Sequence, residues 1–431
     1  MIINLEDKIL TDNTKEIDKN VIFVKTALNE RYVSDLANVK IVTPLELKNY
    51  LLHTPKIIGI TGTNGKTTTA SCIYSILLSL GFKVALCGTR GFFINDIRIS
   101  KKGLTTPTLL ELYHNIHIAS KHNCDYFIME VSSHAISQNR IEGLGFSLKI
   151  LSNIESDHLD FHKTIEEYIR VKNSFFNDDG LKLINKDCNN AIFNVKNAYT
   201  YAIENNANLK VDAYSLRGEI NAHISWNDFR TKEFSSTTIQ SNLIGKYNLY
   251  NIISSIASVK LLCSEIPLNK IALALGEFAG VEGRIEVVNK KPLVVVDFAH
   301  TPDGMKNVFE AFLGNKIKVL FGAGGDRDKT KRPEMGKIAS IYAKKIYLTS
   351  DNPRSENPHF ILQDIMEGIK DKDKVYVESN RKIALHKALS ELECDDILLV
   401  LGKGDETYQI IGDKILDFDD RKIIREFYSK H

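Results

Sequence analysis

The segment IGITGTNGKTTTASCIYSILLSL, residues 58–80, carries the strongest structural signal in this chain. An apolar run of strand length ends just before Gly62, and an apolar pattern of helical length follows Lys66 directly. Between them, glycines let backbone N–H groups approach phosphate oxygens, and the start of a helix adds partial positive charge. The segment therefore predicts a phosphate-binding loop between a strand and a helix.

The side chains of this loop have distinct expected roles. Lys66 would neutralise the β- and γ-phosphates of a nucleotide, and the Thr67 hydroxyl would contact Mg²⁺. The strict phosphate-loop pattern has glycine where this chain has Ile60, and inert glycine turns are common between strands and helices. Lysine and threonine directly after the second glycine nevertheless favour ATP binding. The predicted nucleotide-binding residues of the loop are Gly62, Thr63, Asn64, Gly65, Lys66, Thr67 and Thr68.

Buried strands alternate with helix-length segments on both sides of a more polar middle region. The strands predicted before that region are residues 56–60, 83–88, 126–131 and 148–154, and those after it are 293–300, 317–325, 345–351 and 395–404. Such continuous apolar runs are typical of parallel sheets covered on both faces. Residues 180–245 show strand-like alternation in places, and we interpret them as an appended part of the central domain.

The fold class predicted from this pattern is α/β with three domains. A chain of 431 residues is long enough for about three domains of average size. We expect a small N-terminal α/β domain over 1–52, a central parallel-sheet ATPase domain over 53–288, and a C-terminal Rossmann-like α/β domain over 289–431.

Composition narrows the possible partners. The formal net charge of +2 is too small to indicate a nucleic-acid or membrane surface. Six cysteines lie far apart without a CxxC pair, so neither a disulfide framework nor a zinc site is predicted. The first residues lack a signal-peptide pattern, and no run of 18 apolar residues occurs. We therefore expect a cytoplasmic monomer that acts on small molecules and binds neither nucleic acid nor a membrane.

Polar side chains follow two of the predicted strands, which we expect to be neighbours in the sheet. Glu130 lies at the end of the first of these strands, where a lone glutamate would simply be a solvated strand end. The polar residues that follow are Ser132, Ser133, His134, Gln138 and Arg140 after the first strand, and Asn153, Asp157, His158, Asp160 and His162 at and after the end of the second. Because parallel sheets place ligands at the carboxyl ends of strands, these residues predict a divalent cation beside the nucleotide.

The ordered motifs of the chain resemble those of the Mur ligase family, most closely its tripeptide-forming MurE branch. The matching motifs are TGTNGKTTT (61–69), TTPT (105–108), MEVSSHAISQNRI (129–141), DHLDFH (157–162), EYIRVK (167–172), GKYNLYN (245–251), GVEGRIEVV (280–288), VVDFAHTPDG (295–304), GAGGDRDKTKRP (322–333), DNPRSENP (351–358) and GKGDETYQ (402–409). The resemblance spans residues 56–410. It departs from the family at Asp405, where histidine is more usual, and at Asp12-Asn13-Thr14, where a uridine-contacting motif is expected.

The resemblance implies an ADP-forming amide-bond ligase of peptidoglycan precursor synthesis. ATP would phosphorylate a carboxylate of UDP-MurNAc-L-Ala-D-Glu, and an amine would then displace phosphate from the acyl phosphate. The implied catalytic residues are Lys66, Glu130, His158 and Lys172. The implied Mg²⁺ ligands are Thr67, Glu130, His158 and Lys172 as a carbamate. The implied nucleotide contacts outside the loop are Asn251, Arg284 and Asp297, and those to the UDP-sugar peptide are Thr105, Thr106, Ser132, Gln138 and Arg140.

The resemblance also implies the incoming amino acid, meso-2,6-diaminopimelate. The matching positions are Arg327, Asp351, Asn352, Pro353, Arg354, Gly402 and Glu406. Arg354 can pair bidentately with the distal carboxylate of diaminopimelate, and it would repel the ammonium of lysine. Glu406 suits the distal ammonium. The alternatives are an Arg354 paired with a local acid such as Glu356, L-lysine as substrate, another Mur or folylpolyglutamate-type ligase, and an ATP-binding regulator that makes no peptide bond.

Overall fold

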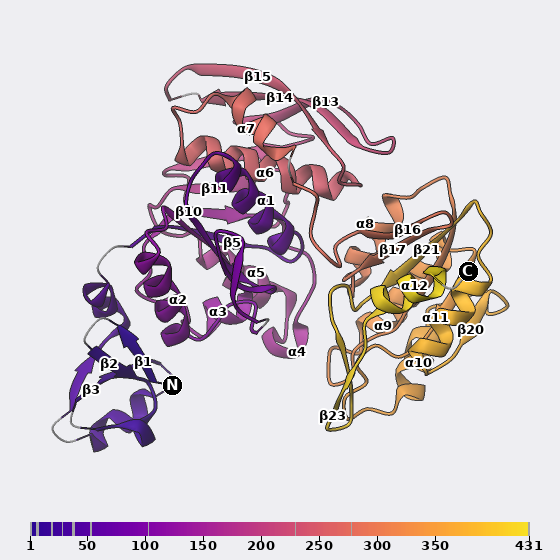
Figure 1. Ribbon diagram of the computed structural model, residues 1–431, viewed down its shortest axis with the longest axis horizontal. Coiled ribbons are helices and arrows are strands. Elements are labelled where there is room, and N and C mark those ends of the chain that lie inside the picture. Colours follow the sequence, from indigo (N-terminus) through magenta and orange to yellow (C-terminus); the bar gives the residue numbers. More distant parts are fainter. Residues whose placement is uncertain are drawn as a thin grey trace.

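A computed structural model of the chain describes residues 2–5, 8–18, 20–27, 29–36, 39–51, 54–101, 103–228, 230–276 and 278–429. Its strands form three sheets and one hairpin, arranged along the chain as three lobes (Figure 1). Among the described residues, no helix is both long and apolar enough to cross a membrane.

The N-terminal sheet has the strand order β1-β2-β3-β4. Its strands are β1 Ile2–Leu5, β2 Lys8–Thr11, β3 Val21–Val24 and β4 Lys40–Val42, with 3-10 turns at Thr14–Glu16, Glu30–Asp35 and Pro44–Tyr50. One face of this sheet packs on α2 (Leu109–Lys121), which follows the central phosphate loop in sequence. Leu110 and Tyr113 of α2 share a buried cluster with Ile3 and Leu10, so the small sheet completes its core against the central lobe.

The central sheet has eleven strands in the order β15-β14-β13-β12-β11-β10-β5-β9-β6-β7-β8. Its strands are β5 Lys56–Thr61, β6 Val84–Gly88, β7 Gly91–Ile94, β8 Ile97–Ser100, β9 Tyr126–Glu130, β10 Phe146–Leu151, β11 Lys182–Asn185, β12 Ala198–Ala202, β13 Leu209–Ser215, β14 Ile220–Asp228 and β15 Glu233–Ser241. The middle of the sheet is parallel, and both ends are antiparallel. The strands predicted within 180–245 are confirmed, and they extend this same sheet.

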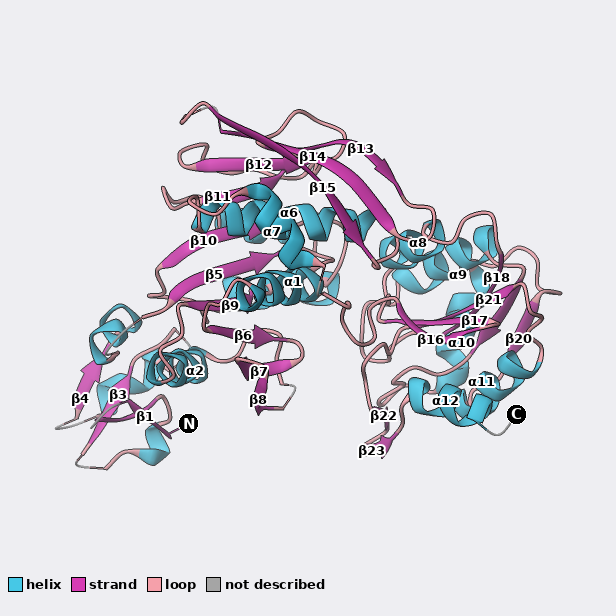
Figure 2. Cartoon of the chain, turned by 45° about the horizontal axis from the view of Figure 1, so that its top comes forward, coloured by secondary structure: helices cyan, strands magenta, loops and turns pink. Residues whose placement is uncertain are grey.

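Helices cover both faces of the central sheet (Figure 2). These helices are α1 Lys66–Ser79, α3 Ser133–Ser137, α4 Leu159–His162, α5 Ile165–Ser174, α6 Lys246–Leu262 and α7 Leu268–Leu275, together with α2. One buried cluster joins α1, α6 and α7 to one face, and a second joins α2 and α5 to the other. Most side chains of α1 are buried because this helix lies between the sheet and α6.

The order of strands corrects one expectation. The strands that precede the two polar clusters, β9 and β10, are not neighbours, because β5 lies between them and pairs in parallel with both. The phosphate loop at the end of β5 therefore separates the two clusters. This order still gathers all three segments at one edge of the sheet, since the carboxyl ends of parallel strands point the same way.

The C-terminal sheet has the order β16-β17-β21-β18-β19-β20 and is parallel except for β16. Its strands are β16 Glu286–Lys290, β17 Leu293–Asp297, β18 Lys316–Phe321, β19 Lys345–Leu348, β20 Val375–Val377 and β21 Asp396–Leu401. Helices α8 Pro302–Glu310, α9 Lys331–Tyr342 and α10 Pro358–Glu367 pack on one face, and α11 Arg381–Ser390 and α12 Asp420–Ser429 on the other. A hairpin, β22 Tyr408–Ile411 and β23 Lys414–Asp417, stands apart. The boundary predicted at 288/289 falls inside β16.

Candidate active site

One cavity of about 1240 Å³ is lined by residues of both the central and the C-terminal lobe. The predicted site residues that line it are Thr63, Asn64, Gly65, Lys66, Thr67, Thr68, Thr105, Glu130, His158, Asn251, Arg284, Asp297, Arg327, Asp351, Asn352, Arg354, Gly402 and Glu406. The predicted residues outside its wall are Gly62, Thr106, Ser132, Gln138, Arg140, Lys172 and Pro353. The cavity thus joins the predicted nucleotide and amino-acid sites.

Two glycines of the phosphate loop are fixed by close approach of other segments. Gly65 has φ of 85°, and a Cβ there would lie 2.4 Å from Asn251 Oδ1 on α6. A Cβ at Gly62 would lie 1.8 Å from the Ser152 hydroxyl, which follows β10. Side chains larger than hydrogen would therefore push the loop away from both neighbours.

Lys66 folds its side chain back over the loop. Its ammonium donates to the backbone oxygens of Gly62 at 2.8 Å and Thr63 at 2.9 Å. Burial lowers the pKa of Lys66, while the negative charges of Glu130 and Asp157 oppose that shift. Neutral carbonyls stabilise an ammonium less than a phosphate does, so a nucleotide phosphate can draw Lys66 away from them.

Lys172, from α5, donates to the same Gly62 oxygen at 2.8 Å. Its side chain is 1% exposed, and its ammonium lies 5.0 Å from the centre of the Tyr168 ring. Burial, and then the charge of Lys66, hold the pKa of Lys172 well below its usual value. A buried lysine with a lowered pKa exists more often as the neutral amine, which is the form that reacts with carbon dioxide.

Glu130 connects the loop to the strand beside it. Its carboxylate accepts from Thr67 Oγ1 at 3.0 Å, from Thr89 N at 2.8 Å and from Thr89 Oγ1 at 3.0 Å. Carboxylate and hydroxyl oxygens at the mouth of a phosphate loop are the donors that Mg²⁺ prefers, so these residues fit the predicted ion. Within the described part of the chain, no three His, Cys, Asp or Glu side chains converge on a metal position by themselves. Thr67 and substrate oxygens would complete the coordination.

His158 precedes α4 and lines the cavity, with its backbone in the left-handed region at φ of 54°. Burial lowers the pKa of His158 to about 4, despite the opposing charge of Asp157. Its ring lies edge-on to His134, with centroids 4.9 Å apart, and its Nε2 lies 3.4 Å from Asp157 Oδ2. His158 is therefore neutral at pH 7, which is the protonation state that a metal ligand requires.

The residues predicted to bind the UDP-sugar peptide form a connected group beside this cavity. Thr106 Oγ1 donates to the Glu130 backbone oxygen at 2.9 Å and accepts from Ser132 N at 2.9 Å. Arg140 donates to Gln138 Oε1 at 2.9 Å through Nε and to the Thr106 backbone oxygen at 2.9 Å through Nη1. The structure therefore brings four of the five residues together around α3, and Thr105 reaches the cavity wall next to them.

The segment between the two lobes supplies Arg284. Its guanidinium lies 4.2 Å from the centre of the Phe298 ring, just after β17. Asp297, at the end of β17, accepts from Ile285 N at 2.8 Å and Ala299 N at 2.7 Å. Burial raises the pKa of Asp297, and Arg284 partly offsets that shift. Asn251 also lines the cavity, and its Oδ1 accepts from Thr69 Oγ1 at 3.2 Å.

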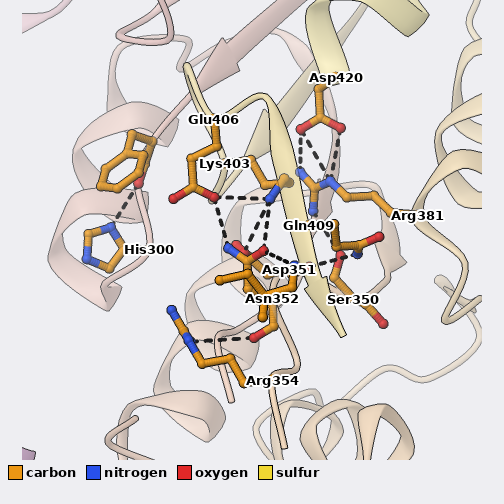
Figure 3. A network of polar contacts seen from close by, with 12 residues as sticks. His300, Ser350, Asp351, Asn352, Arg354, Arg381, Lys403, Glu406, Gln409 and Asp420 are labelled. Atoms are coloured by element: carbon orange, nitrogen blue, oxygen red, sulfur yellow. Dashed lines mark hydrogen bonds and ion pairs between the residues drawn. The ribbon is translucent and has the colours of Figure 1, made fainter. Parts of the chain in front are cut away.

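The residues predicted to bind the amino acid, here called the amino-acid pocket, belong to a network of ionic and amide contacts in the C-terminal lobe (Figure 3). Asn352 Nδ2 donates to Glu406 Oε2 at 2.9 Å, and the Asn352 Oδ1 accepts from Ile410 N at 2.9 Å. Lys403, whose side chain is fully buried, donates to Glu406 Oε2 at 3.0 Å. Gly402 has φ of 106°, and a Cβ there would lie 2.5 Å from Asp351 Oδ2.

Arg354 is held by backbone groups rather than by an acid. Its Nη1 donates to the Gly325 oxygen at 2.7 Å, and its backbone N donates to the Ile410 oxygen at 3.1 Å. The local acid, Glu356, instead pairs with Arg332 at 2.9 Å and Lys329 at 3.1 Å. The backbone of Arg354 is in the left-handed region at φ of 52°, a conformation that residues with side chains rarely adopt. A strained arginine on a cavity wall is a candidate ligand contact.

Comparison with known proteins identifies the family. The family model described as "Mur ligase middle domain" matches residues 60–259, and that described as "Mur ligase, glutamate ligase domain" matches residues 283–404. A Helicobacter pylori (strain J99) protein named "UDP-N-acetylmuramoyl-L-alanyl-D-glutamate--2,6-diaminopimelate ligase" is 57% identical over 97% of this chain and 95% of its own length. A Helicobacter hepaticus protein of the same name is 54% identical over 98% of this chain and 92% of its own.

The chain belongs to the Mur ligase family.

Solved structures agree with the fold of this Mur ligase. A structure titled as a UDP-N-acetylmuramoyl-L-alanyl-D-glutamate--2,6-diaminopimelate ligase matches with a TM-score of 0.66 and 26% identity, over 98% of this chain and 95% of that one. A Mycobacterium tuberculosis folylpolyglutamate synthase complexed with ADP matches with a TM-score of 0.66 and 15% identity, over 83% of this chain and 90% of its own. The second likeness concerns the fold alone. The predicted family and α/β fold class are confirmed.

Sequence reasoning missed several residues that shape the site of this Mur ligase. Thr89 binds the Glu130 carboxylate, and Lys403 binds that of Glu406. Arg332 is fully buried and joins Glu356 to Asp364 and to the Gly324 oxygen. Thr89 and Arg332 are distant in sequence from their acidic partners, so periodicity could not pair them. A lysine inside a glycine-rich strand end, as in GKGDE, was the available signal for Lys403.

Proposed function

We propose that this Mur ligase adds meso-2,6-diaminopimelate to UDP-MurNAc-L-Ala-D-Glu, with ATP as the energy source, in peptidoglycan precursor synthesis. The single observation that supports this best is that one cavity is lined by the phosphate loop and also by Arg354 and Glu406. The names of the relatives that are 51–57% identical over nearly the whole chain describe the same reaction. The family is ATP-dependent, and related folds bind ADP or AMPPNP with Mn.

The first half-reaction takes place at the phosphate loop. A carboxylate of the terminal D-glutamate attacks the γ-phosphorus of ATP, so ADP leaves and an acyl phosphate forms. Lys66 would exchange the Gly62 and Thr63 oxygens for the phosphates and so stabilise the charge in transit. Thr67 and Glu130 would hold Mg²⁺, which neutralises the charge of the phosphates when bound.

His158 and Lys172 are proposed for a second Mg²⁺. His158 is neutral at pH 7 and lies on the cavity wall. Lys172 needs modification to hold a metal ion through oxygen, because its amine offers no oxygen ligand and carries a positive charge when protonated, whereas a carbamate would add oxygens and a negative charge. Its burial and lowered pKa favour the reactive neutral amine.

The second half-reaction joins the amino acid. The neutral amine of diaminopimelate attacks the acyl carbon, an amide bond forms, and phosphate leaves. Arg354 would bind the distal carboxylate and Glu406 the distal ammonium, with Arg327 and Asn352 nearby on the same wall. L-Lysine lacks the distal carboxylate, so binding it would leave Arg354 without its anion.

A competition assay tests this function. Purified protein is incubated with ATP, Mg²⁺, UDP-MurNAc-L-Ala-D-Glu and equal amounts of meso-diaminopimelate and L-lysine, and the products are identified by mass spectrometry. We expect the diaminopimelate adduct together with one phosphate released per adduct. A lysine adduct would keep the ligase but refute the role of Arg354.

Omitting each substrate in turn separates the remaining alternatives. Phosphate release without the UDP-linked dipeptide or without an amino acid would indicate an ATPase of another purpose. Turnover with a folate and glutamate in place of the cell-wall substrates would indicate a folylpolyglutamate-type ligase, whose structures share this fold at 14–20% identity.

A further inference from the structure

Lys403 lies at the centre of the amino-acid pocket, although the proposed substrate contacts do not include it (Figure 3). Its side chain is fully buried, and its ammonium reaches Glu406 Oε2 at 3.0 Å and Asn352 Oδ1 at 3.3 Å, with Asp351 Oδ1 4.0 Å away. Burying an ammonium costs free energy that only partners of this kind can offset. The chain therefore maintains a buried cation beside the residues that bind the amino acid.

Two opposite charges, Arg354 and Glu406, line the same cavity. Both contact Asn352: Arg354 Nη1 donates to its backbone oxygen at 3.5 Å, and Glu406 accepts from its Nδ2 at 2.9 Å. Both also act on Tyr408, whose pKa is raised by burial and by Glu406 and is lowered by Arg354. Side chains of opposite charge that contact the same residue would pair with each other if neither were restrained.

We propose that Lys403 is a positioning residue that keeps Glu406 from pairing with Arg354. The inference rests on the proposed function, because its benefit is to a substrate whose far end carries both a carboxylate and an ammonium. Lys403 and Asn352 hold the same oxygen of Glu406, and the Gly325 carbonyl holds Arg354 Nη1 at 2.7 Å. The pocket thereby presents two separate charges, and the substrate need not break an internal ion pair.

A comparison of crystal structures tests the position of Glu406 without any substrate. In Lys403→Met, which removes the charge at similar length, we expect the Glu406 carboxylate to turn away from residue 403 and pair with Arg354. In the unsubstituted protein the two should remain apart. This measurement does not depend on which amino acid is ligated, whereas turnover of the unsubstituted enzyme with meso-diaminopimelate tests the proposed function separately.

Kinetics with meso-diaminopimelate test the consequence. We expect K403M to lose kcat/KM about tenfold more than E406Q does, because K403M would disable both charges and E406Q only one. The double variant K403M/E406Q should recover to the level of E406Q, since no carboxylate is left to occupy Arg354. The KM for ATP should be the same in all three variants. A residue that merely supports the fold would leave the double variant as impaired as K403M.

Two results would overturn the inference: a Glu406 that stays in place in the K403M structure, or a double variant that remains well below E406Q. If K403M does not fold, the comparison of E406Q with K403M/E406Q decides alone, because the double variant removes both members of the buried pair together. Equal kcat/KM for meso-diaminopimelate in these two variants supports a role exerted through Glu406. A deficit in the double variant assigns Lys403 some other role and refutes the proposal.

Discussion

The phosphate loop and the amino-acid pocket line one cavity, yet they hold their charged groups in different ways. In the loop, Lys66 and Lys172 both donate to the carbonyl of Gly62, a neutral acceptor. In the pocket, Lys403 and Glu406 form an ion pair, and Asn352 fixes the carboxylate a second time. Lys66, the cation of the loop, thus donates only to neutral acceptors, whereas the buried cation of the pocket pairs with an acid of the pocket itself.

This difference indicates how much each half of the site should rearrange when its substrate binds. ATP brings several negative charges, so the loop gains binding energy when phosphate oxygens replace the carbonyl oxygens that bind Lys66. A zwitterionic amino acid brings little net charge, and its recognition depends on where the pocket groups already lie. We therefore expect the loop to rearrange on binding and the pocket to stay as it is.

The largest effect should follow loss of the loop cation. In Lys66→Ala we expect turnover to fall by about a thousandfold or more, because the transferring phosphoryl group loses its nearest positive charge. Phosphate release and adduct formation with saturating substrates measure this. The control is Lys121→Ala, at the exposed end of α2, which should leave turnover unchanged. Full activity of Lys66→Ala would show that Lys66 has no role in the proposed mechanism. The proposed contrast between the loop and the pocket would then fail.

The pocket should show a smaller and more selective effect. In Arg354→Ala we expect the KM for meso-diaminopimelate to rise by roughly 10- to 100-fold, the usual value of a charged hydrogen bond. Arg354→Lys should restore little, because a lysine lacks the planar fork that matches a carboxylate. Steady-state kinetics with each substrate varied separately measure both.

The KM for ATP is the internal control for Arg354, and Arg425→Ala on α12 is the external one, since its exposed guanidinium pairs with Glu286 outside the cavity wall. A parallel rise in the KM for ATP and for diaminopimelate would mean that Arg354 supports the whole cavity. In that case the two regions would not be independent.

The same contrast explains how much of the site the sequence could reveal. The phosphate loop is continuous from Gly62 to Thr68 and is built by backbone geometry between a strand and a helix, so local pattern was enough to predict it. Strands β5, β6 and β9 were predicted to within one residue at each end, because buried parallel strands read as unbroken apolar runs.

The pocket and the sheet order depend on contacts that local pattern does not contain. Asn352 and Glu406 were found only through the family resemblance, and their link through Lys403 was not found at all, because it joins the ends of β19 and β21. In the same way, the position of β5 between β9 and β10 follows from the path of the chain through space, so the two polar clusters were wrongly expected to be neighbours. The roles of the site residues stay predictions.

The smallest expected effect is that of alanine at a loop glycine, and it separates the cost of a left-handed backbone from the cost of a steric clash. Gly65 and Gly81 have nearly the same φ, 85° and 90°, but a Cβ at Gly65 would lie 2.4 Å from Asn251 Oδ1, whereas nothing lies within 4 Å of a Cβ at Gly81. Both alanine variants should lose about 1–2 kcal/mol of unfolding free energy, because a residue with a side chain is strained in the left-handed region. Gly65→Ala should lose more unfolding free energy than Gly81→Ala and should also raise the KM for ATP, because Asn251 must move. Chemical denaturation and ATP kinetics measure the two variants side by side. Equal losses, with the KM for ATP unchanged in both, would mean that the loop gives way easily and that its glycine serves backbone conformation alone.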